Sequence, residues 1–240
     1  MRNLLELVQD ACYEMGIPAP SAVIGSTDFQ VQQLLALSNR GGKELAARQG
    51  RDGGWPQLVK EYTFTTVIST AAYDFPSDLQ YFVNTTQWDR TQKWPVRGPV
   101  SPQEWQVLKS GTVGSAGPRT RFRIKAGQLY LDPTPSAADD LVIEYYSTGW
   151  CESSVGTAQT RWAADDDLPV LPDDCLVLDL IWRFKRSKGL DYGQDYNMCE
   201  DSIAREIGRA GMAPVLSMDG SVNSARLLDD SNIPDTGMGS

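Results

Sequence analysis

The chain has 240 residues with 22 Lys plus Arg, 31 Asp plus Glu and a formal net charge of -9, and this length can bury one sizeable core or two small ones. It contains no histidine, which excludes Ser-His-Asp and Cys-His catalytic sites and histidine-containing zinc sites. The acidic balance removes the overall attraction for phosphate that non-specific nucleic-acid binders use, so we expect any contact with DNA to be local or transient.

Two amphipathic helices are predicted in the first 60 residues. Residues 3–15 form the first helix, which begins with a capping box made by Asn3 and Glu6. The second helix extends from residue 27 or 28 to about residue 49. The pair Gly41-Gly42 lies inside it, and because each glycine costs about 1 kcal/mol relative to alanine, we expect a kink or a close helix contact there.

From residue 61 the sequence changes to the two-residue alternation of a half-buried strand, which extends to about Ile68. The segments RFRIK and QLYLD flank the two-residue turn Ala126-Gly127 and predict a β-hairpin over residues 121–132. Between the strands, SPQEWQVLKSG predicts one short helix that Ser101 caps. Further strands are expected at residues 79–83 and 141–147.

Helices return after a segment that we predict to be a polar linker, residues 151–167. The next segment, residues 171–189, has acids in its first turn and bases in its last, which matches the helix dipole. Its interior from Cys175 to Phe184 is apolar on nearly all sides, as in the central helix of a bundle. A last helix is predicted from one apolar stripe, made by Tyr192, Tyr196, Cys199, Ile203 and Ile207.

Residues 212–240 contain no helical or strand period and are rich in Ser, Gly, Asp and Asn. A segment of this composition orders when a partner holds it, so we expect a partner-binding tail.

These elements predict an α+β fold: an antiparallel bundle of the N- and C-terminal helices, a small antiparallel β domain inserted into it, and an extended C-terminal tail. We place the N-terminal bundle helices at residues 1–60, the inserted β domain at 61–150, the linker and C-terminal bundle helices at 151–211, and the tail at 212–240.

The four cysteines, Cys12, Cys151, Cys175 and Cys199, include no C-x-x-C pair. They are typical of ordinary thiols in a reducing compartment, although their even number leaves distant disulfides open. No segment approaches the roughly 18 apolar residues of a membrane span, and no targeting signal is visible. We expect no metal and no cofactor.

Acidic clusters are the groups available for acid–base catalysis. A glycosidase needs two carboxylates placed across a sugar, one of them with a pKa raised by burial. Adjacent acids in polar turns or at a helix start do not fit that requirement, so we expect no enzyme. The clusters are Asp139-Asp140, residues 165–167 and Asp173-Asp174.

Two basic runs are candidates for contact with phosphate or with an acidic surface. The first, Arg183, Lys185, Arg186 and Lys188, coincides with the C-terminal half of a helix, where the dipole favours bases. The second run alternates along the predicted hairpin, so its side chains project to one side of the strand. We interpret it as a solvated face, or as a face that meets an acidic neighbour or nucleic acid. It consists of Arg119, Arg121, Arg123 and Lys125.

The seven tryptophans fall into two groups. The first group, Trp55, Trp105 and Trp182, is expected to pack in helices or turns. The second group lies in loops or at strand ends and is a candidate for an interface. It contains Trp88, Trp94, Trp150 and Trp162.

Several segments occur in an order that points to a known family. After two N-terminal helices come GGWP, YTFTTV, YDFPSDLQYFV, RFRIKAGQLYLDPTP, LVIEYY and LPDDCLVLDLIWRFKRSKGLDY. Over residues 1–210 this order resembles the head-to-tail adaptors of short-tailed phages, of the tail tubular protein A type. No single segment is diagnostic, and the resemblance depends on their order.

The resemblance implies a structural virion protein without catalytic residues. It implies a helical bundle with a β insertion, assembled as a ring of twelve at the head–tail junction after synthesis in the host cytoplasm. The implied partners are further copies of the chain, the portal protein above, the tail nozzle below, and tail fibre or spike proteins. DNA would pass through the ring without sequence-specific binding, and an acidic chain would not hold it during ejection.

The resemblance also suggests roles for particular residues. In relatives the C-terminal segment reaches the portal, and the apolar residues of the tail are our candidate anchors: Val215, Leu216, Leu227, Leu228 and Ile233. Candidate contacts with other subunits or with the nozzle are Arg119, Arg121, Arg123, Lys125, Trp88 and Trp94.

Two other functions stay open. One is a carboxylate-dependent polysaccharide hydrolase of the tail, which predicts two buried acids facing each other across a cleft. The other is a stopper or terminator ring protein of a long-tailed phage.

Overall fold

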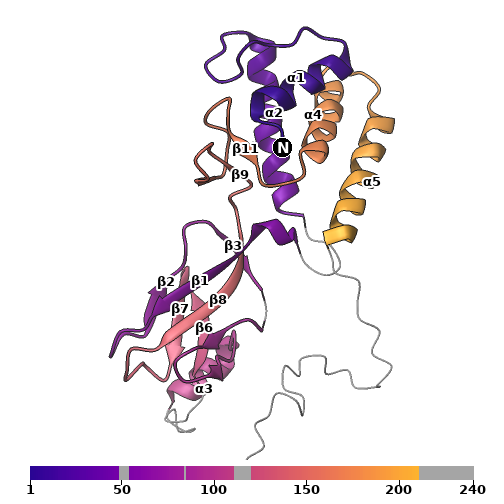
Figure 1. The fold of residues 1–240 in the computed structure, drawn as a ribbon. Helices are drawn as coiled ribbons and strands as arrows, with labels where there is room; N and C mark the ends of the chain where they lie inside the picture. Colours follow the sequence, from indigo (N-terminus) through magenta and orange to yellow (C-terminus); the bar gives the residue numbers. More distant parts are fainter. Residues whose placement is uncertain (49–53, 84, 111–119, 211–240) are drawn as a thin grey trace, which may run out of the picture.

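A computed structural model describes residues 1–48, 54–83, 85–110 and 120–210 (Figure 1). The predicted partner-binding tail, residues 212–240, lies outside them. The helices of the described residues are α1 (Leu4–Met15), α2 (Phe29–Ala46), α3 (Pro102–Lys109), α4 (Asp173–Ser187) and α5 (Gly193–Ala210), with a 3-10 turn, η1, at Pro56–Leu58.

The strands are short, and all the strand pairs within the three sheets are antiparallel. They are β1 (Val59–Thr65), β2 (Ala72–Asp74), β3 (Leu79–Phe82), β4 (Trp88–Asp89), β5 (Trp94–Pro95), β6 (Arg121–Lys125), β7 (Gln128–Asp132), β8 (Asp140–Ser147), β9 (Cys151–Glu152), β10 (Ala158–Gln159) and β11 (Leu168–Pro169). Helices α1, α2, α4 and α5 gather at one end of the molecule and β1 to β8 at the other (Figure 1). We call these parts the helical body and the β sandwich.

Local sequence signals explain where several helices begin and end. In α1, the Asn3 side chain accepts from the Glu6 backbone and the Glu6 carboxylate accepts from the Asn3 backbone, so the predicted capping box is confirmed. Gly16, in the left-handed conformation, ends that helix. The same box, made by Ser101 and Glu104, begins α3.

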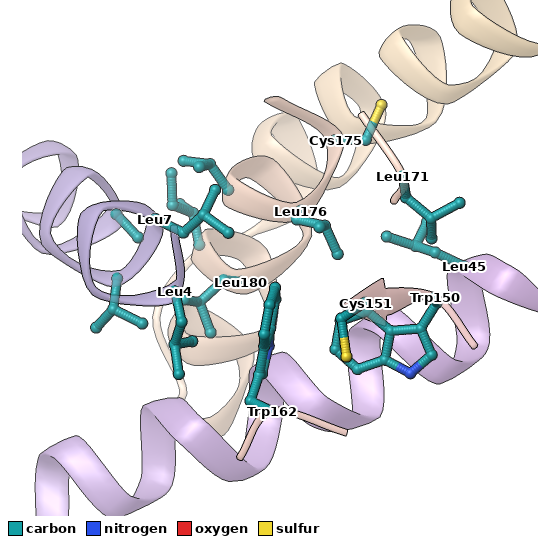
Figure 2. Close-up of a cluster of buried hydrophobic side chains, with 14 of the residues drawn as sticks. Leu4, Leu7, Leu45, Trp150, Cys151, Trp162, Leu171, Cys175, Leu176 and Leu180 are labelled. Atoms are coloured by element: carbon teal, nitrogen blue, oxygen red, sulfur yellow. The ribbon is translucent and has the colours of Figure 1, made fainter. Parts of the chain in front are cut away.

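Helix α4 is the centre of the helical body, as its apolar sequence predicts. It contacts α1, α2 and α5, and nearly every residue from Cys175 to Phe184 is buried. Figure 2 shows Leu176 and Leu180 of α4 beside leucines of α1 and α2 and two tryptophan rings. The residues that complete this core include Leu4, Leu7, Leu45, Trp150 and Trp162.

The glycine pair of α2 allows two close approaches. A Cβ atom on Gly41 would collide with the carboxylate of Asp179 in α4, and one on Gly42 would collide with the ring of Trp150. The predicted close helix contact is therefore confirmed. Helix α2 ends at Ala46, a little before the predicted position near residue 49.

The β sandwich consists of two sheets with a small core between them. The larger sheet has the order β1-β8-β4-β5, with β3 also paired to β8, and the smaller has the order β2-β7-β6. Phe122 and Leu129 of the smaller sheet pack against Leu141 and Ile143 of the larger one. The β6–β7 hairpin has the predicted register, and Ala126 and Gly127 both take positive φ in its turn.

Two segments differ from the sequence-based expectation. Strand β1 ends at Thr65 instead of Ile68, because the Thr66 backbone and hydroxyl bond to the 137–139 segment; Ile68 is 61% exposed. The predicted polar linker contains β9 and β10; β9 is the central strand of a small sheet against the helical body and pairs with both β10 and β11. Helices and antiparallel sheets are thus both present, and the description as a bundle with an inserted domain stays a prediction.

Candidate functional site

The outer face of the smaller sheet carries the basic run of the hairpin. Arg121, Arg123 and Lys125 alternate with Phe122, which is buried in the sandwich core. Since side chains alternate along a strand, the three cations project away from that core. We call these three residues the basic face. Arg119, the first member of the predicted run, lies outside the described residues.

The cations of the basic face lack ion pairs within the described residues, although the charge of Arg121 acts on the nearby Glu104 carboxylate of α3. Among the described residues, no ion pair joins Arg121, Arg123 or Lys125 to a carboxylate. The nearest acid in the strand pairing, Asp132 opposite Arg121, is bound by Lys109 of α3 instead. Arg123 and Lys125 are thus available to an acidic partner, and Arg121 lies at the edge of the face toward α3.

The outer face of the larger sheet carries Trp88 and two glutamates. Trp88 lies opposite Val142 of β8 and is 43% exposed, and Glu61 of β1 lies opposite Glu144 of β8. Residues directly opposite each other in an antiparallel pair share a face, and Val142 and Glu144 are two residues apart on one strand. The side chains of Trp88, Val142, Glu61 and Glu144 therefore lie on one side of the sheet. We call them the Trp88 face.

The carboxylates of the Trp88 face have different surroundings. Arg90 donates to Glu61 at 2.7 Å, whereas Glu144 forms no ion pair within the described part of the chain. Trp94 lies opposite Asp89, so it projects to the other side of the sheet at its rim, where it is also 43% exposed. The two tryptophans predicted as contacts are therefore exposed, but on different faces.

Trp150 and Trp162, the other two interface candidates, are buried in the helical body, so that expectation is wrong. Each is 1% exposed, and their rings meet edge to face with centroids 4.9 Å apart. The Trp162 indole N–H donates to the Ser38 hydroxyl at 2.9 Å. Both tryptophan rings pack against residues of α2 that are more than 100 positions away in the sequence. Trp55, Trp105 and Trp182 are buried, as predicted.

The first basic run is divided between residues paired within the helical body and exposed residues. Arg183 is only 7% exposed and donates to Asp179 at 2.6 Å and to Glu44 at 2.8 Å, while Lys185 pairs with Asp195. Burial raises the pKa of Asp179, and its bonds to Arg183 act in the opposite direction. The surface interpretation is therefore wrong for Arg183, whereas Arg186 and Lys188 are exposed.

The predicted acidic clusters do not form a catalytic pair. Asp167 is buried, but its carboxylate accepts two backbone N–H groups, from Ala163 and Ala164. Asp165 accepts from the backbone of the loop before α2, at Val23 and Ile24. These acids hold loops in place.

One buried acid at the sandwich rim has a perturbed pKa. Burial raises the pKa of Asp89, with a smaller contribution from the charges of Asp139 and Asp140, while the Gln92 backbone N–H donates to its carboxylate. Within the described residues, no group of three His, Cys, Asp or Glu side chains is arranged to hold a metal ion.

Two of the grooves on the surface of the described structure are lined by charged residues. One, of about 560 Å³, runs between α3 and β6 and is lined by Arg97, Val100, Val107 and Arg121 among others. The second, of about 420 Å³, lies between α1 and α5, where Arg2 pairs with Asp10 and Asp174. Neither groove has the opposed pair of buried carboxylates that a glycosidase requires.

The four cysteines are free and buried. Burial raises the pKa of the Cys151 and Cys199 thiols to about 12, so neither is a reactive thiolate. The helices that the structure describes include none long and apolar enough to cross a membrane.

Sequence reasoning named the basic run and Trp88 but missed the two glutamates beside Trp88. Glu61 lies at the start of the alternation that identified β1, yet its pairing with Glu144 depends on a register between strands about 80 residues apart. The candidate tail anchors Val215, Leu216, Leu227, Leu228 and Ile233 lie outside the described residues.

Comparison with known families gives one match, and no curated protein matches the chain. The family model described as SU10 adaptor protein matches residues 2–223, nearly the whole chain. The name indicates a phage adaptor, which supports a structural role in the virion over an enzymatic one. The short-tailed, tail tubular protein A type stays a prediction. The chain belongs to the SU10 adaptor protein family.

Proposed function

We propose that the chain is a head-to-tail adaptor that forms a ring of twelve between the portal and the tail nozzle. The ring surrounds the path of the genome and lets DNA pass without sequence-specific binding. The protein functions by binding other proteins, and no residue of the chain catalyses a reaction.

The observation that carries this proposal is the extent of the family match. It covers residues 2–223, so it includes the helical body, the β sandwich and the first twelve residues of the tail. A match that continues past α5 indicates that the beginning of the tail is also a family feature, which supports a role for the tail in binding.

The charges of the described residues support the same proposal. The strongly buried acids Asp132, Asp167 and Asp179 each bind a cation or backbone N–H groups, as expected of groups that stabilise a fold. The unpaired charges of the basic face and Glu144 are instead at the surface, where a partner can reach them.

Deletion of residues 212–240 tests the proposal. We expect the shortened chain to keep the helical content and thermal transition of the full chain, because the described helices and core end at α5. We expect its binding to purified portal protein to weaken at least tenfold. Unchanged binding and assembly of the shortened chain on portal would refute the role of the tail.

A full-length variant provides a finer test. Replacing the apolar pair Leu227 and Leu228 by Asp removes two anchors and adds charge, so it should weaken portal binding nearly as much as the deletion. The matched control replaces Ser221 and Ser224 by Asp, which adds the same charge without removing apolar side chains. If both variants weakened portal binding equally, the loss would come from the added charge and not from the removal of apolar anchors.

A further inference from the structure

The basic face and the Trp88 face lie on opposite sides of the β sandwich. Each is the outer side of a sheet whose inner side contributes to the shared core, through Phe122 and Leu129 on one sheet and Leu141 and Ile143 on the other. Along each strand, the residues that alternate with these core residues point outward, and they point in opposite directions on the two sheets.

The two faces are complementary in charge. The basic face presents three cations that no described carboxylate pairs, and beside them lies the half-buried ring of Tyr130, opposite Arg123. The Trp88 face presents Glu144 without an ion pair, Glu61 held by Arg90, and an exposed indole. An exposed tryptophan beside carboxylates is the composition of a binding hot spot for an Arg-rich surface.

A closed ring of identical subunits needs this arrangement. In a head-to-tail ring each copy uses two different patches, one for the preceding neighbour and one for the following neighbour, and the patches must complement each other. Two complementary faces on opposite sides of one rigid sandwich meet that requirement. A two-fold dimer, which pairs a patch with itself, would bring like charges together.

Nucleic acid is a poorer partner for the basic face. The chain has a net charge of -9, which opposes approach to a polyanion, and Asp74 lies in the outer row of the same sheet, opposite Gln128. A patch of three cations beside an acid suits a protein surface with a few carboxylates.

We propose that in the assembled ring the basic face of each copy binds the Trp88 face of the next copy. This inference rests on the proposed ring and adds the surfaces that form it. The central contact is between Arg123 and Glu144, with the Trp88 ring packed beside them.

Charge reversal of one residue on each face tests the proposal. Arg123→Glu should bring two carboxylates together at the central contact, and Glu144→Arg should bring two guanidinium groups together there. Each variant alone should bind portal as single copies with at least tenfold less adaptor ring than the unmodified chain. Neither side chain forms an ion pair in the described structure, so both variants should fold, which circular dichroism verifies.

An experiment that mixes the two variants is the decisive test. In an equimolar mixture with portal protein, alternating copies can pair faces of opposite charge, so the ring should recover relative to either variant alone. The control variant Arg161→Glu makes the same change of charge at an exposed residue outside both faces. It should assemble alone as the unmodified chain does, which would show that a charge reversal outside the two faces leaves the ring intact.

Each result has a distinct meaning, read as the number of adaptor chains per portal by mass measurement. If the unmodified chain forms no ring on portal, the proposed function and this inference both fail. If it forms a ring and the single variants do so equally well, the inference fails while the proposed function stands. The inference also fails if the mixture does not recover, or if Arg123→Glu reduces binding of duplex DNA while the ring is unchanged.

Discussion

The candidate residues of the helical body and those of the β sandwich differ in burial and in charge pairing. In the helical body, Trp150 and Trp162 are buried and Arg183 is bonded to Asp179 and Glu44. In the β sandwich, Trp88 and Trp94 are exposed and the cations of the basic face form no ion pair with the described carboxylates. This contrast supports our proposal that the body supplies stability and that the sandwich supplies surfaces for assembly.

The largest expected effect contrasts a tryptophan from each region. Trp162→Ala should lower the free energy of unfolding by about 3–5 kcal/mol, because it leaves a cavity in the body core and removes the bond to Ser38. Trp94→Ala, at an exposed rim position, should cost less than about 1 kcal/mol. Urea unfolding followed by circular dichroism measures both. Similar losses in the two variants would contradict the division of roles.

Removal of the buried cation should be the next largest effect. Arg183→Met leaves the carboxylate of Asp179 buried without its partner, which should cost about 3 kcal/mol at pH 7. The unpaired carboxylate should have a still higher pKa, so protonation should favour the folded variant. Its deficit relative to the unmodified chain should therefore be smaller at pH 4 than at pH 7.

A double variant separates charge from packing at this site. In Arg183→Met with Asp179→Asn, neither member of the pair keeps its charge, so most of the pH dependence of the deficit should disappear. A deficit of the single variant that is the same at both pH values would show that the loss comes from packing alone.

A smaller effect is expected where α2 meets α5. Arg48 donates to Glu200 through two bonds of 2.6 and 2.7 Å, and this lowers the pKa of Glu200 below its ordinary value near 4.5. The pair therefore stabilises the protein above that pH, and its contribution is lost as the pH falls through the lower, folded-state pKa.

Arg48→Met tests this pair. Because both side chains are about one-third exposed, the variant should lose only about 0.5–1 kcal/mol at pH 7. The loss should shrink on acidification below pH 4.5, as measured by thermal or urea unfolding across pH. A deficit that grows on acidification would reverse the sign expected from the Glu200 pKa.

The smallest stability effect is expected on the basic face. Arg123→Glu should change the free energy of unfolding of the free chain by less than about 0.5 kcal/mol, since Arg123 is a half-buried strand residue that pairs with no described carboxylate. A loss above about 2 kcal/mol would mean that this face belongs to the folding core, and the contrast between the two regions would fail.

Elements defined by local signals were predictable from the sequence. The capping residues Asn3 and Ser101, and the hairpin turn at Ala126-Gly127, act through neighbours a few residues away, so their positions follow from spacing. The alternation of β6 also predicted which side of the strand carries Arg121 and Arg123, and hence half of the candidate site.

Features that depend on distant contacts were not predictable. Trp162 lies in a polar segment but is buried because Ser38 and Asn39 of α2 bind it. Arg183 has the sequence context of a surface base, yet Asp179 and Glu44 surround it in the fold. The Trp88 face forms only when β1, β8 and β4 pair in the observed register, so no local sequence pattern predicts it.

The mass of the complex formed by the full-length chain and purified portal protein tests the central proposal most directly. We predict that the chain adds to portal as a ring of twelve copies and that no such ring forms on portal when residues 212–240 are removed. A portal that binds no adaptor chains, or only scattered single copies, would contradict the proposal that this protein joins head to tail.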